Sequence, residues 1–198
     1  AKPPEPEALH ERAMDNLRYI RETMERAGAF TAVPGWGGAA MGVTALAAAY
    51  LASRQETLHG WMLTWLLDAL AAGLIGLFAT AYKARATKIP VFSVPARKFI
   101  LAFAPPLAAG AVLTPVLYAS GLHARLPGVW LLMYGAAVAT GGAFSVRVVP
   151  VMGLSFMALG VAALASPAHL GDAYMAAGFG GLQILFGLIM TLTFTLAA

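Results

Sequence analysis

The sequence predicts an all-α integral membrane protein with six transmembrane helices and a separate N-terminal segment. Of its 198 residues, 60% are hydrophobic and 11% are charged, whereas an average soluble domain is about 25% charged. Six of the nine acidic residues fall in the first 25 positions, which leaves long stretches without charge. These stretches are about 20 residues long, the length that a helix needs to cross the hydrocarbon core.

Six such stretches make up a transmembrane domain from 30 to 198. Each should be helical, because backbone amides in lipid must be paired within their own segment. The fifth is short, but neighbouring helices can shelter a short span and the bilayer can thin around it. The predicted spans are 34–53, 58–82, 98–120, 127–146, 149–165 and 173–196.

The distribution of basic residues predicts the orientation of these spans. Eleven of the thirteen Lys and Arg residues precede the first span or lie between spans 2 and 3 or spans 4 and 5. The opposite loops hold only Arg54 and Arg125. Because cytoplasmic loops collect Lys and Arg, we expect both termini in the cytoplasm and a location in the bacterial cytoplasmic (inner) membrane. We therefore attribute the net charge of +4 to basic residues that set the orientation of the spans, and not to binding of nucleic acid. We expect no nucleic-acid partner.

Residues 1–29 form a cytoplasmic unit with a proline-rich start and a predicted amphipathic helix from about Glu7 to Ala27. Apolar residues recur there at steps of three and four, which places them on one face. This helix either lies on the membrane surface or its own bundle, or docks on a partner subunit or a second copy. A face that mixes acids and bases fits partner contact better than lipid binding, which favours basic faces. The candidate partner-binding residues are Leu9, Leu17, Ile20 and Met24.

Short internal similarities suggest three helical hairpins. The segments "FTAVPGWGG", "FSVPARK" and "FSVRVVPVMG" each lead into a span from the cytoplasmic side, and "TLHGW", "LHARLPGVW" and "AHLGDAY" share a His, a Gly and an aromatic residue on the other side. Related hairpins of this kind would give a pseudo-threefold arrangement about the membrane normal, unlike the inverted repeats of many secondary transporters.

Asp68 is the acid that lies deepest inside a predicted span. Ten residues from the span start at 1.5 Å each place it about 15 Å deep, near the bilayer midplane. An acid there costs about 2.5–3.5 kcal/mol and should face the protein interior. Gln183 shares this depth, and Thr64 lies one turn earlier on the same face. These residues predict an intramembrane polar set, with Asp68 either a neutral interhelical hydrogen-bonding group or a proton relay, cation relay or ligand contact.

The remaining polar residues give little sign of catalysis or a cofactor. His59, His123 and His169 lie near the outer span ends and could hold zinc if the hairpins gathered them. Their spacing matches no metal motif, and we expect no metal site. The chain contains no cysteine, and no His lies inside a span to bind haem. The sequence shows no nucleophile–base pair and no paired carboxylates, so we predict neither enzyme activity nor a cofactor. We expect lipid to be bound to the membrane-spanning helices.

Small residues and prolines set how the spans pack. Gly38 and Gly42 form a GxxxG pair, and glycines recur in the first, fourth and sixth spans, where they allow helices to approach closely. The glycines of "VPGWGG" lack the strand and the Lys–Ser/Thr pair of a phosphate-binding loop. Pro105, Pro106 and Pro115 should kink or partly unwind the third span.

Two stretches carry a family resemblance: "NLRYIRETMERAGAFTAVPGWGGAAMGVTALAAA" (16–49) and "LPGVWLLMYGAAVATGGAFSVRVVPVMGLSFMALG" (126–160). They resemble a group of uncharacterised six-span bacterial membrane proteins of the acidobacterial type. The resemblance covers most of the chain but transfers no activity or site residues. In that group the gene often lies beside one for a winged-helix transcriptional regulator, which implies a regulatory or accessory role.

The sequence therefore favours a non-catalytic accessory or regulatory membrane protein, a subunit or partner-binding protein of a membrane complex. Its predicted partners are membrane lipid and either another protein or a second copy, bound through the N-terminal helix and the glycine-rich spans. The alternative is a small channel or secondary transporter that uses Asp68 as a protonatable or cation-binding group.

Overall fold

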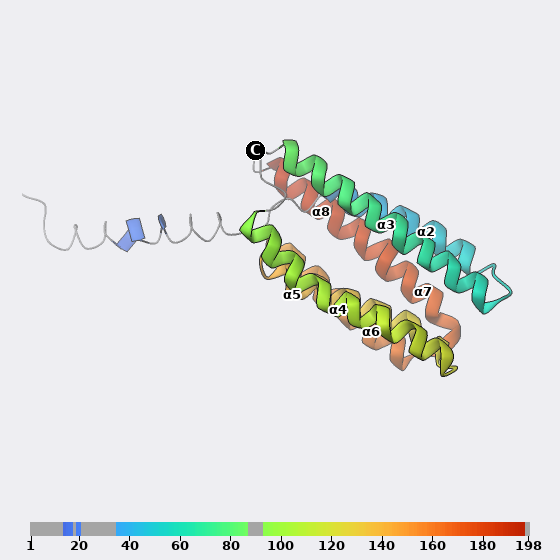
Figure 1. Ribbon diagram of the computed structural model, residues 1–198. Helices are drawn as coiled ribbons and strands as arrows, with labels where there is room; N and C mark the ends of the chain where they lie inside the picture. The colour runs from blue at the N-terminus through green and yellow to red at the C-terminus, as the bar shows by residue number, and fades with distance from the viewer. Residues whose placement is uncertain (1–13, 18, 21–34, 87–92, 197–198) are drawn as a thin grey trace, which may run out of the picture.

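The computed structural model describes residues 14–17, 19–20, 35–86 and 93–196, and the elements within these ranges are helices (Figure 1). The bounds of the long helices fall within four residues of the predicted spans. The elements are α2 (Gly35–Ala52), α3 (Leu58–Ala86), α4 (Val94–Ala119), η1 (His123–Arg125), α5 (Leu126–Gly142), α6 (Val148–Ala165), η2 (Ala168–Leu170), α7 (Gly171–Met175), η3 (Ala176–Leu182) and α8 (Gln183–Leu196).

Five helices in the described part of the chain are long and apolar enough to cross a membrane. This confirms the predicted class, an all-α multi-pass membrane protein. The last of the five combines α7, η3 and α8, where η3 is a seven-residue π-helical segment rich in glycine. The five spans are Gly35–Ala52, Leu58–Arg85, Val94–Ala119, Val148–Ala165 and Ala168–Thr193.

The N-terminal helix lies mostly outside the described residues. Residues 14–17 and 19–20 are helical, and Leu17 and Ile20 are exposed. The other two candidate partner-binding residues, Leu9 and Met24, fall outside the described ranges.

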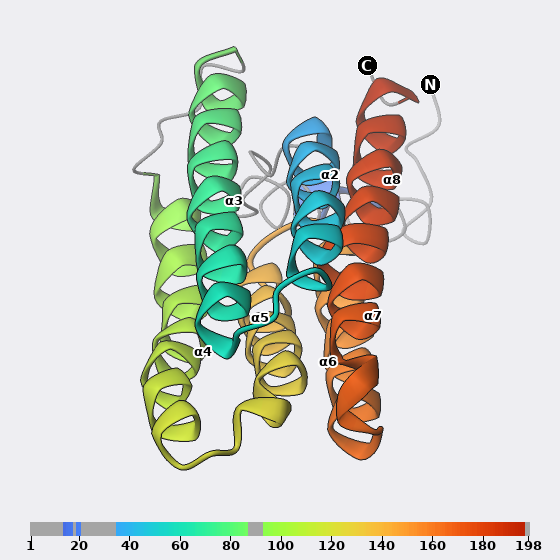
Figure 2. The same ribbon diagram turned by 90° about the vertical axis from the view of Figure 1, so that its right-hand side faces the viewer.

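The spans form two groups of three helices (Figures 1 and 2). In the first group α2 packs between α3 and the α7–η3–α8 span, and in the second α5 packs between α4 and α6. Each middle helix runs antiparallel to both neighbours, and α2 and α5 run in opposite directions (Figure 2). The groups meet where α5 contacts α7 and where α6 contacts η3 and α8. Leu131, Phe156 and Met175 are fully buried in the shared core.

Glycines spaced by seven residues join the closest helix pair of each group. Gly128 and Gly135 of α5 face Gly160 and Gly153 of α6, and Gly35 and Gly42 of α2 face Gly187 and Gly180 of the last span. A Cβ atom on Gly135 would lie 2.7 Å from the Gly153 carbonyl oxygen, and one on Gly187 would lie 2.7 Å from that of Gly35. A seven-residue step returns to the same helix face, so each series keeps two backbones in contact over two turns.

This pairing differs from the predicted threefold set of hairpins. α6 packs most extensively on α5, and the last span packs more extensively on α2 than on α6. The physical reason is that the glycine series brings the last span against α2, while α5 packs on both of its chain neighbours, α4 and α6. The predicted partial unwinding at the prolines is also absent, because α4 is helical throughout Val94–Ala119 with all three prolines inside it.

Candidate functional site

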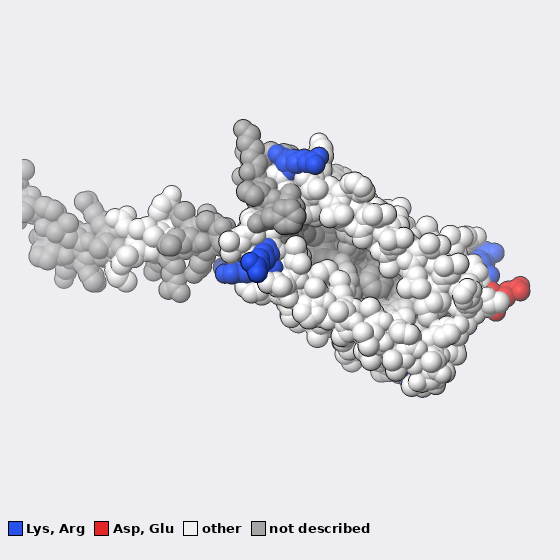
Figure 3. Space-filling view, in the orientation of Figure 1, with Lys and Arg blue, Asp and Glu red and all other residues white. Residues whose placement is uncertain are grey.

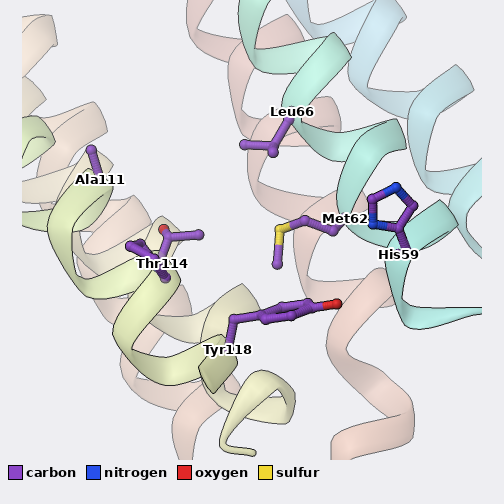
Figure 4. Close-up of a pocket in the computed structure, with 7 residues that line it drawn as sticks. His59, Met62, Leu66, Ala111, Thr114 and Tyr118 are labelled. Atoms are coloured by element: carbon purple, nitrogen blue, oxygen red, sulfur yellow. The ribbon is translucent and has the colours of Figure 1, made fainter. Parts of the chain in front are cut away.

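α3 and α4 do not pack closely along most of their length, and the surface between them is hollowed toward the middle of the helices (Figure 3). A groove of about 470 Å³ lies between the same two helices at the start of α3 and the end of α4, within the range of about 300–1,000 Å³ that ligand pockets occupy. We call it the α3–α4 groove. It is lined by His59, Met62 and Leu66 of α3 and by Ala111, Thr114, Pro115 and Tyr118 of α4 (Figure 4).

The two walls of the groove are antiparallel and follow one register. The groove begins at His59 and Tyr118, near the ends of their helices. It ends at Leu66 and Ala111, which lie seven residues deeper on the same helices. At 1.5 Å per residue the groove is about 10 Å long. That approaches the depth of one leaflet, which is half of the hydrocarbon core of about 30 Å.

Behind the groove, tryptophans and an acid connect four helices. The indole Nε1 of Trp61 and that of Trp65 both donate to Asp172 Oδ1, at 2.7 and 3.3 Å. The Trp61 ring stacks on Trp130 of α5 at 5.6 Å between centroids. Trp130 Nε1 in turn donates to Thr114 Oγ1 at 2.8 Å. This network ties α3 and α7 of the first group to α5 and α4 of the second, at the end where the groove opens.

A second contact between the groups lies deeper in the core. The Tyr134 hydroxyl of α5 donates to Gln183 Oε1 of α8 at 3.3 Å. The Tyr134 ring also contacts Phe156 of α6 and Phe179 of η3 edge-on, at 4.9 and 5.2 Å. Gln183 is the buried polar residue of the described core, and this hydrogen bond satisfies an amide that would otherwise be costly to bury.

The predicted pair of Asp68 and Gln183 is not formed, because α2 lies between their helices. Asp68 is half-buried and hydrogen-bonded to the Thr44 side chain of α2. Thr44 Oγ1 also donates to the Met41 carbonyl at 2.8 Å. Thr64 donates to the Gly60 carbonyl of its own helix at 2.9 Å and joins neither residue.

The three histidines are not gathered into a site. His59 lies at the open end of the groove, while His123 and His169 lie in the short segments η1 and η2. Within the described ranges, no three His, Asp or Glu side chains lie close enough to hold a metal ion.

Reasoning from sequence missed the network built on Asp172. Trp61, Trp130 and Asp172 all lie near ends of the predicted spans, and span prediction alone does not connect them. A signal was available, because Trp61 and Trp65 are four residues apart and share one helix face. Two indole N–H groups on one face that packs into the protein require an acceptor, and Asp172 is the acid at the corresponding end of the last span.

Comparison with known proteins gives no relative: no protein-family model, no curated protein and no solved structure matches the chain.

Proposed function

We propose that this chain is a non-catalytic accessory or regulatory subunit that associates with a membrane partner along α3 and α4. The observation that carries this proposal is the uneven burial of the spans. Only 11% of the most apolar stretch of α3 and 6% of that of α4 is buried, against 44% for α2 and 39% for the last span. These two helices, 29 and 26 residues long, therefore offer large apolar faces on either side of a groove.

The proposal includes six spans with both termini in the cytoplasm of a bacterium. α5 supplies the sixth span: its 17 residues extend about 26 Å at 1.5 Å each, and it lies along the whole of α6. Lys83, Arg85, Arg97 and Lys98 lie at one end of the helices and Arg54 and Glu56 at the other. The face between these ends that Figure 3 shows carries no charged side chain. The more basic end is the expected cytoplasmic end.

The state of the internal polar groups supports an accessory role over transport. Among the described residues, each buried side-chain nitrogen and oxygen has a hydrogen-bond partner within the chain. Asp172 is occupied by two indoles, Gln183 by Tyr134 and Asp68 by Thr44. An ion path normally leaves ionisable groups facing a water-filled cavity, whereas the α3–α4 groove has mainly apolar walls.

Site-directed crosslinking tests the association face, and the absence of native cysteine makes single-cysteine variants simple to read. Leu70→Cys on α3 and Leu101→Cys on α4 would carry a photoreactive maleimide, with Leu154→Cys on α6 as the matched control. The three side chains are similarly exposed, at 62, 62 and 60%. We expect one protein adduct of defined mass from the α3 and α4 positions only. Lipid adducts alone at all three positions would contradict the proposal.

A small transporter is the second candidate, favoured by the opposite directions of the two three-helix groups. Inverted-topology repeats are common in secondary transporters, where sites lie near the midplane between repeats, and Asp68 lies in the middle part of α3. If the protein is a transporter, Asp68 is the group that we expect to bind the transported proton or cation.

Asp68→Asn separates the two candidates. Asn keeps a hydrogen-bonding group for Thr44, and membrane hydrogen bonds average about 0.6 kcal/mol, so we expect a stability change below about 1 kcal/mol. In sealed proteoliposomes, the accessory role predicts no specific proton or cation flux from either protein. A flux from the parent chain that Asp68→Asn abolishes, with unchanged folding, would establish transport instead.

A further inference from the structure

The polar groups of the α3–α4 groove are divided by depth. The Thr114 hydroxyl, deeper in the groove, accepts from Trp130 and donates to the Gly110 carbonyl, so its hydrogen is already used. At the open end, the side chains of His59 and Tyr118 make no hydrogen bond to another group that the structure describes. The Tyr118 ring reaches from α4 toward α3, below His59 (Figure 4). The groove therefore offers free polar groups at its mouth and saturated or apolar groups beyond.

The groove is too short to seat a membrane-spanning helix along its length. Its length of about 10 Å corresponds to fewer than two helical turns of 5.4 Å. An extended hydrocarbon chain is thinner and can follow the antiparallel walls from the mouth to Leu66 and Ala111. The length of about 10 Å lies within one leaflet, the part of the bilayer where a phospholipid places its acyl chain.

We infer that the α3–α4 groove is a binding site for one phospholipid acyl chain from the leaflet at the His59 end. In the proposed orientation this is the outer leaflet. The chain lies between Met62 and Leu66 on one side and Ala111 and Pro115 on the other, and His59 and Tyr118 contact the ester and headgroup region. This site is independent of the protein association proposed above, because it concerns the groove between the helices rather than their outward faces.

Retained lipid, counted per chain, tests this inference. The full-length protein would be purified in detergent, washed extensively, and its phospholipid and quinone content measured by mass spectrometry. Ala111→Trp fills the groove from α4, and Leu66→Trp fills it from α3, which guards against one variant failing to fold. Val112→Trp is the matched control, because Val112 adjoins Ala111 but lies outside the groove lining and is 66% exposed.

We expect about one phospholipid per chain for the parent protein and for Val112→Trp. Both groove-filling variants should elute as folded protein with about tenfold lower retention, since excluding even two methylene groups changes affinity by that much. Equal retention by all four proteins, no phospholipid on the parent chain, or a quinone in its place would overturn the inference. A chain that crosslinks to its partner but retains no lipid would overturn this site and leave the proposed association intact.

Discussion

Replacing Gly135 with alanine is expected to destabilise the protein more than any other single-methyl change described here. The new Cβ would lie 2.6 Å from the Met157 amide nitrogen and 2.7 Å from the Gly153 carbonyl oxygen. Both neighbours are backbone atoms, so α5 and α6 would have to move apart. Overpacking costs about 1–3 kcal/mol and occasionally more. We expect about 3 kcal/mol, which corresponds to a fall of about 10 °C in Tm for a chain of this size.

Gly73→Ala is the matched control for this prediction. Gly73 lies in α3 with no atom within 4 Å of its hypothetical Cβ, so the same methyl group meets nothing. Because alanine favours helix by up to about 1 kcal/mol over glycine, Tm should stay the same or rise. Thermal unfolding of both variants in the same detergent measures the difference. Equal Tm values for Gly135→Ala and Gly73→Ala would show that the glycine contacts do not hold the second group together.

Replacing Asp172 with leucine is expected to disconnect the network at the open end of the groove. Trp61 and Trp65 would both lose the acceptor for their indole N–H groups, and Trp65 is buried. Each unsatisfied buried donor costs about 1–3 kcal/mol, so we expect a loss of about 2–5 kcal/mol. Tryptophan fluorescence should shift to longer wavelength as the ring pair of Trp61 and Trp130 opens to solvent.

Asp172→Asn separates the lost hydrogen bonds from the lost charge. The asparagine carbonyl oxygen still accepts from both indoles, so it should recover more than half of the stability lost in Asp172→Leu. Glu56→Leu, a change at an exposed acid of the α2–α3 loop, should alter Tm by less than about 2 °C. If Asp172→Leu and Asp172→Asn unfold at the same temperature, the indole contacts contribute nothing measurable.

The class of the protein and the extent of its helices follow from hydropathy alone. Spans need a minimum apolar length, and this constraint is strong enough that the predicted and observed bounds of α6, 149–165 and Val148–Ala165, differ by one residue. The largest differences occur at the more basic ends of the helices, where α3 continues through charged residues to Ala86. Helical hydrogen bonds persist there after the apolar stretch has ended, and hydropathy does not report them.

Helix partnership was harder to predict, because hydropathy carries no information about neighbours. The chain order suggested a hairpin of the fifth and sixth spans, whereas the glycine series pair α6 with α5 and the last span with α2. Their spacing of seven was visible in the sequence, but only the contact geometry shows which series meet. The partners of Asp68 were missed for the same reason: depth placed it level with Gln183, and α2, which separates them, supplied Thr44 instead.

The central proposal, an accessory subunit that associates along α3 and α4, is tested most directly by its composition in the native membrane. The full chain would be extracted with its surrounding lipid into polymer-bounded nanodiscs, and intact assemblies weighed by native mass spectrometry. We predict a second protein in a fixed ratio to this chain. This protein should be lost when Leu70 and Leu101 are both replaced by tryptophan, and it should be retained when Leu154 is replaced by tryptophan. Recovery of the chain alone, together with an Asp68-dependent flux in proteoliposomes, would contradict the accessory role and establish the transporter.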